Sequence, residues 1–136
     1  GLVIMYSKDM LIGILLSGAK TEIQIIKDEK SQMGYRVRLK VNLRGREKFL
    51  KAVQRSLLQH HIDCNISEKE SKARPQPILR IGGIKNIYKT CSLIPIGLYD
   101  RNDDWPLFAE AVDIVANNNH LTLEGLDGLF QMKGLI

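Results

Sequence analysis

The chain has 136 residues, a net charge of +5 at neutral pH, 44% hydrophobic residues and 26% charged residues. This length can bury the core of one globular domain and is too short for two, so residues 1–136 are predicted to form a single domain. The longest apolar stretch, Met10 to Ala19, is about half of a membrane span, and two cysteines cannot build a disulfide scaffold. We therefore expect an intracellular protein that makes no use of a membrane.

The positive charge is concentrated in the middle of the chain. Between Lys20 and Lys89 there are 17 lysines and arginines against 7 acids, whereas the rest of the sequence has 3 basic and 8 acidic residues. A segregated basic surface is typical of proteins that bind a polyanion such as nucleic acid. A solvated face that only maintains solubility is the alternative, and composition alone does not separate the two.

The first predicted element is a helix over residues 10–17 that is apolar on all sides. Ser7 is suited to cap its N-terminus, and Asp9 lies in its first turn. Gly13 and Ser17 are four residues apart and form a stripe of little bulk, along which a second helix can approach. The sequence therefore predicts a homodimer seam here, with the core helix of a monomer as the alternative. The residues assigned to the seam are Leu11, Gly13, Ile14 and Ser17.

Two strands are predicted next, over residues 21–27 and 35–43. The second strand alternates strictly. Val37, Leu39, Val41 and Leu43 would face a core, and Arg36, Arg38, Lys40 and Asn42 would lie on the other side. Cations on that side would be spaced about 6.6–6.8 Å apart. Because ordinary solvated strand faces mix acids with bases, this acid-free row favours polyanion binding.

The remaining pattern predicts an α+β fold with an antiparallel sheet. An amphipathic helix over residues 46–60 is followed by short strands at 62–66 and 78–81, then by helices at 84–93, 104–116 and beyond Thr122. Tyr88, Trp105 and Phe108 fall within apolar patterns, so we expect all three rings in the core.

Several segments, in this order, resemble the LAGLIDADG homing endonucleases, in particular the single-motif type encoded by organellar introns. Residues 11–19 (LIGILLSGA) resemble the helix that names the family, and residues 79–87 (LRIGGIKNI) resemble its fourth strand running into its third helix. Further likeness lies at residues 23–28, 39–43, 105–108, 112–115 and 119–126. The resemblance implies an αββαββα fold, in which a four-stranded antiparallel saddle has its helices on one face.

The resemblance also implies a function. A single motif implies a homodimer that seats its sheet in the major groove of a near-palindromic duplex DNA site and cleaves it with Mg²⁺, in a mitochondrion or chloroplast. The side chains expected to enter the groove are Lys20, Glu22, Gln24, Arg36, Arg38, Lys40 and Arg80. Those expected to contact phosphate are Lys69, Lys72 and Arg74. Among the groove contacts, Glu22 would accept from a cytosine amino group.

One position departs from the family pattern. Where the family has an acid that holds divalent metal over the scissile phosphates, this chain has Gly18, which offers at most its carbonyl. Arg101 matches a lysine that the family places near the scissile phosphate. We therefore expect weak or absent cleavage. A natural or engineered inactivating change, a DNA-binding protein without nuclease activity, a maturase that holds intron RNA, and a basic structural protein of an organellar particle are the alternatives.

Overall fold

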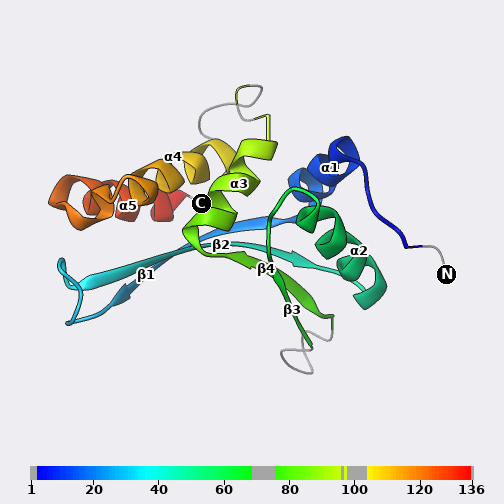
Figure 1. Cartoon of the computed structure of the whole chain (residues 1–136). Helices are drawn as coiled ribbons and strands as arrows, with labels where there is room; N and C mark the ends of the chain where they lie inside the picture. The colour runs from blue at the N-terminus through cyan, green and yellow to red at the C-terminus, as the bar shows by residue number, and fades with distance from the viewer. Residues whose placement is uncertain (1–2, 69–75, 96, 98–103, 136) are drawn as a thin grey trace.

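The molecule has two layers, a four-stranded antiparallel sheet and a set of helices packed on one of its faces (Figure 1). The computed structural model describes residues 3–68, 76–95, 97 and 104–135. The helices are α1 (Lys8–Gly18), α2 (Glu47–Leu58), α3 (Ile84–Leu93), α4 (Asp104–Ala116) and α5 (Leu123–Leu135), with a 3-10 turn η2 (Asn119–Leu121) before α5. The strands are β1 (Lys20–Lys27), β2 (Tyr35–Arg44), β3 (Asn65–Ser67) and β4 (Ile78–Gly82). The predicted fold class is confirmed.

The strands lie in the order β1-β2-β4-β3, and every neighbouring pair is antiparallel. β1 pairs with β2 from Lys20 opposite Asn42 to Lys27 opposite Tyr35, whereas β4 leaves the sheet after Gly82, which lies opposite Lys40. β1 and β2 therefore continue past β4 as a two-stranded ribbon. Helices α4 and α5 both contact β1 along this ribbon, and α1 and α2 lie at the other end of the sheet (Figure 1).

The core fills the space between the layers because β2 alternates as its sequence predicts. Leu39, Val41 and Leu43 are each no more than 6% exposed, and the intervening residues lie on the opposite face. Fully buried side chains from the helices meet them, chiefly Leu11, Leu15, Leu50, Val53, Ile87 and Phe108. All the described helices pack on this one side, and none of them covers the other face of the sheet (Figure 1).

The prediction that Tyr88 lies in the core is wrong. Its side chain is 52% exposed, because Ile87 and Cys91 occupy the buried side of α3 and leave Ile84 and Tyr88 on the outer side. The prediction is confirmed for Trp105 and Phe108, whose rings pack edge to face with centroids 6.2 Å apart.

The third strand is shorter than predicted. Residues 62–64 precede it, and neighbouring side chains bind two of their backbone groups in place of a sheet ladder. The Asp63 N–H donates to Asn86 Oδ1 at 3.1 Å, and Gln54 Nε2 donates to the carbonyl of Cys64 at 3.0 Å. Ile62 is fully buried nonetheless, which explains why its apolar character suggested a strand.

Helix α1 is fixed at its start by a cap and by the segment that precedes it. The predicted cap is confirmed, since Ser7 Oγ accepts from the Met10 N–H at 3.3 Å. Just before it, the Tyr6 N–H donates to Ser56 Oγ of α2 at 2.7 Å, and Arg55 Nε donates to the carbonyl of Ile4 at 3.2 Å. No helix in the described part of the chain has the length and apolar character needed to cross a bilayer.

Candidate nucleic-acid interface

The uncovered side of the sheet carries the side chains that the strand alternation directs away from the helices. We call this set the open face. It consists of Lys20, Glu22, Gln24 and Ile26 of β1, Arg36, Arg38, Lys40 and Asn42 of β2, Asn65 of β3 and Arg80 of β4. Seven of these positions are residues that the sequence predicted to be groove contacts, and the fold brings them onto one surface.

The register places the polar residues of the open face in lines across the strands. Gln24 lies opposite Arg38, and Glu22 lies opposite Lys40. A longer line runs across all four strands through Lys20, Asn42, Arg80 and Asn65. Neighbouring strands are about 4.8 Å apart, so these side chains form a lattice of hydrogen-bonding groups whose spacing is fixed by the backbone.

Four cations of the open face have no carboxylate partner among the described residues. Within the described residues, the salt bridge present joins Lys51 Nζ to Glu47 Oε1 on α2, at 3.0 Å. Lys20, Arg36, Arg38 and Lys40 therefore have no carboxylate partner in that part of the structure. Arg36 and Arg38 are exposed, and Lys40 is half-buried. The open face thus presents uncompensated positive charge to a ligand.

Two predicted sets of contacts lie outside the described residues. Lys69, Lys72 and Arg74, expected to contact phosphate, fall between β3 and β4, and Arg101 falls just before α4. In contrast, Arg80 is described and lies half-buried on the open face. Sequence reasoning missed Asn65, which joins the face only through the pairing of β3 with β4 and has no periodic signal of its own.

The end of α1 does not fit a divalent metal site. Gly18 is exposed at the last position of the helix and has no side-chain oxygen. Among the described residues, no group of three or more histidine, cysteine, aspartate or glutamate side chains is placed to hold a metal ion. Glu22, the nearest acid in the following sequence, lies on the open face and accepts a hydrogen bond from Gln24 Nε2 at 2.6 Å. Because Mg²⁺ requires hard anionic oxygen ligands, no catalytic step through this ion follows from these residues.

Neither cysteine is an activated nucleophile. Burial, with a smaller contribution from Asp63, raises the pKa of Cys64 to about 11. Burial, with a smaller contribution from Asp113, raises the pKa of Cys91 to about 12. Both cysteines are therefore thiols rather than thiolates at neutral pH. Burial also lowers the pKa of His120, which keeps its imidazole neutral.

Helix α1 presents the stripe of small residues outward, as predicted, but one assigned seam residue is wrong. Leu11 is fully buried in the protomer's own core, because it lies on the same side of the helix as Leu15, so its side chain cannot meet a second copy. Gly13 and Ser17 are exposed and Ile14 is half-buried. A Cβ atom added at Gly13 would meet no atom within 4 Å, so the stripe is open space in the protomer.

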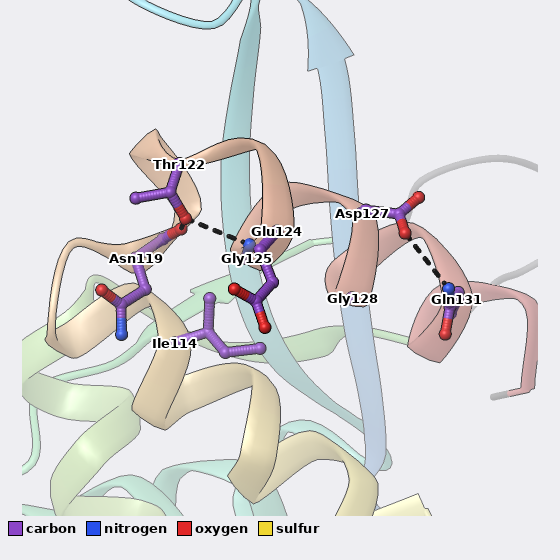
Figure 2. Close-up of a pocket in the computed structure, with 8 residues that line it drawn as sticks. All are labelled: Ile114, Asn119, Thr122, Glu124, Gly125, Asp127, Gly128 and Gln131. Atoms are coloured by element: carbon purple, nitrogen blue, oxygen red, sulfur yellow. Dashed lines mark hydrogen bonds between the residues drawn. The ribbon is translucent and has the colours of Figure 1, made fainter.

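The acidic residues gather elsewhere, in the helical layer. A cavity of about 640 Å³ between α4 and α5 is lined in part by Glu124 and Asp127 (Figure 2). Thr122 Oγ1 accepts from the Gly125 N–H at 3.1 Å there and so caps the N-terminus of α5. Gln131 Nε2 donates to Asp127 Oδ2 at 3.2 Å (Figure 2). This acidic surface is the opposite of what a polyanion requires.

No family model and no curated protein matches the sequence. The fold, however, is similar to that of solved homing endonucleases. I-TnaI superimposes with a TM-score of 0.79 at 15% identity, covering 96% of this chain and 87% of that one. The archaeal intron-encoded homing endonuclease I-Vdi141I, complexed with DNA, gives a TM-score of 0.78 at 15% identity, covering 93% of this chain and 79% of that one. The meganuclease I-SmaMI, bound to uncleaveable DNA, gives 0.77 at 19% identity, covering 97% of this chain but only 44% of its own. The chain therefore has the LAGLIDADG homing-endonuclease fold, as the sequence resemblance predicted.

Proposed function

We propose that this protein binds duplex DNA by placing its open face in a major groove. The observation that carries the proposal is that Lys20, Arg36, Arg38 and Lys40, on two neighbouring strands, have no carboxylate partner among the described residues. Every described helix that packs on the sheet lies on its opposite face, so these cations are not covered by a helix. A B-DNA major groove is about 12 Å wide and admits a two-stranded ribbon, which is the form of β1 and β2. The similarly folded I-Vdi141I and I-SmaMI are each bound to DNA, which supports DNA as the ligand.

The chemistry of the open face suits base edges as well as phosphates. Arg38 can donate two hydrogen bonds to guanine O6 and N7, and Gln24, directly opposite it, can pair with adenine N6 and N7. Lys20 and Arg36, near opposite ends of the β1–β2 pair, are suited to phosphate oxygens. Since each phosphate contact releases counterions, binding is expected to weaken steeply as salt is added.

Duplex DNA fits this surface better than folded intron RNA. An A-form RNA helix has a deep and narrow major groove that side chains cannot enter. The side chains of the open face that would contact bases project from a sheet, not from a loop or a single helix end. The same ribbon that enters a B-form groove would therefore be excluded from double-stranded RNA.

We propose that the binding unit is a homodimer joined through α1. The exposed stripe of Gly13 and Ser17 is flanked by Met10, which is 55% exposed and which sequence reasoning did not include. Ser17 Oγ donates to the carbonyl of Gly13 at 2.7 Å, so this hydroxyl is satisfied within the helix and does not oppose close packing. A two-fold dimer doubles the open face and matches a near-palindromic site.

We further propose that the protein binds without cutting, because Gly18 supplies no carboxylate at the end of α1. A site can be selected from a random duplex library and used to measure both properties. We expect salt-sensitive binding of that duplex, weak competition by double-stranded RNA, and no nicking of a plasmid containing the site in Mg²⁺ or Mn²⁺.

The variant Gly18→Asp tests whether the missing carboxylate at this position accounts for the expected absence of cleavage. An added Cβ would lie 3.2 Å from Leu43 Cδ1, so folding of the variant must be verified by circular dichroism. Nicking by the variant and not by the unaltered protein would support the assignment of this position. Robust nicking by the unaltered protein would contradict it, and binding that shows no dependence on salt would contradict the proposed interface.

A further inference from the structure

A single carboxylate lies in the middle of the open face. Glu22 is the only acidic residue within the four described strands, where it lies opposite Lys40 and between Lys20 and Gln24 on its own strand. A negative charge at this point is repelled by the phosphates of any duplex that occupies the face. It therefore lowers affinity for DNA of every sequence, and a compensating role must lie in discrimination.

The neighbouring amide is held by this carboxylate. Gln24 Nε2 donates to Glu22 Oε1 at 2.6 Å, and both side chains are half-buried, so the pair is more ordered than two free surface side chains. One carboxylate oxygen of Glu22 and the carbonyl oxygen of Gln24 remain as acceptors. Two acceptors side by side favour a partner that brings hydrogen-bond donors.

Base edges differ in what they offer to such a pair. In the major groove, cytosine N4 and adenine N6 are amino donors, whereas guanine O6 and N7 and thymine O4 are acceptors. An amino group can donate to the Glu22 carboxylate, while an acceptor placed there leaves the carboxylate desolvated and unpaired. Arg38, opposite Gln24, has the reverse preference because it can only donate.

We infer that Glu22 is a specificity-determining residue of the open face, which selects a base with an amino group in the major groove (cytosine or adenine) beside the base contacted by Arg38, and rejects guanine and thymine there. Gln24 also holds Glu22 in place through one N–H of its amide, which leaves the other N–H and the carbonyl oxygen for its own base contact. This inference rests on the proposed binding of duplex DNA. In this role, Glu22 lowers the affinity for DNA in general and increases the difference in affinity between DNA sequences.

The test compares the full chain with Glu22→Gln, which keeps the side-chain shape and removes the charge. Preferred sites are selected from a random duplex library for each protein, and affinities are measured for the best site, its single-base variants and an unrelated duplex. We expect Glu22→Gln to bind the unrelated duplex about threefold more tightly. We expect its discrimination at one base position to fall by roughly fivefold to a hundredfold, with the other positions unchanged.

Two further variants separate charge from geometry. Glu124→Gln makes the same chemical change on α5, at the acidic cavity in the helical layer (Figure 2). It should alter neither the affinity for the unrelated duplex nor the discrimination between bases. Glu22→Asp keeps the charge but shortens the side chain, so it should lose discrimination without gaining general affinity. This variant also keeps the test open if Glu22→Gln does not fold.

The outcomes distinguish the inference from the proposal on which it rests. Unchanged base preferences in both Glu22 variants, with tight salt-sensitive binding, would overturn the inference alone. The same gain in general affinity for Glu124→Gln as for Glu22→Gln would also overturn it, since net charge would then explain the effect. If the unaltered protein binds no duplex, the proposed function fails as well.

Discussion

The open face and the end of α1 differ in how much each depends on one residue. On the open face, four cations that have no carboxylate partner in the described part of the chain are distributed over two strands, and any one of them can be lost while the others continue to attract a polyanion. At the end of α1, a single position, Gly18, lacks the carboxylate that metal chemistry would need. If the open face binds DNA as proposed, binding does not depend on Gly18, because the proposed contacts and the end of α1 are located on different residues.

The largest effect should come from removing several cations of the open face at once. The triple variant Arg36→Ala, Arg38→Ala and Lys40→Ala is expected to weaken duplex binding by about a hundredfold or more. The slope of log affinity against log salt concentration should become shallower by about three, one for each cation removed. Fluorescence anisotropy over a salt series measures both. A matched triple of exposed cations on the helices, Lys48→Ala, Lys85→Ala and Lys133→Ala, removes the same charge and should have little effect.

Equal losses in the two triple variants would remove the distinction between the open face and the rest of the surface. Binding would then depend on net charge alone, and the lines of residues across the strands would have no special role.

A smaller effect is expected at the α1 stripe, where the proposal is a dimer. Gly13→Met adds bulk into open space, so the protomer should fold normally, but the added side chain would separate two α1 helices. We expect the dimer dissociation constant, measured by sedimentation velocity, to rise by about tenfold or more, in line with the cost of overpacking.

The control for this variant is Gly134→Met. Gly134 also has no atom within 4 Å of an added Cβ, but it lies near the end of α5. Dimerisation equally affected by both substitutions, or a protein that is monomeric at all accessible concentrations, would contradict the seam.

The smallest effect compares two glycines of the same helix. Gly13→Ala should raise the free energy of unfolding by about 0.5–1 kcal/mol, because it restricts the unfolded chain and improves helix propensity. Gly18→Ala should gain less, because its Cβ would lie 3.2 Å from the buried Leu43 Cδ1. Urea denaturation at concentrations below dimer formation measures the difference, and identical gains would indicate that Leu43 moves aside freely.

The sequence predicted the elements whose periodicity is imposed by burial on one side. The limits of α3 and α4 agree with the structure, and those of β2 and α2 differ by no more than two residues at either end, since their apolar residues recur at the spacing of a strand or helix. The third strand was misplaced because Asn86 and Gln54 bind backbone groups that a local pattern cannot assign. Tyr88 was misassigned because an aromatic residue next to buried Ile87 looks the same in sequence whichever side of the helix it occupies.

Part of the candidate site could likewise be predicted from the sequence, and part of it required the fold. The acid-free row of β2 and the absence of an acid at Gly18 are properties of residue type and alternation, so they were visible before any fold was known. That Glu22 lies opposite Lys40, that Asn65 joins the same face, and that Leu11 is buried in its own protomer depend on strand register and on which helix covers which side of the sheet. The local sequence determines which side chains of a strand share a face. Which of the two faces becomes buried is decided only when distant segments pack together.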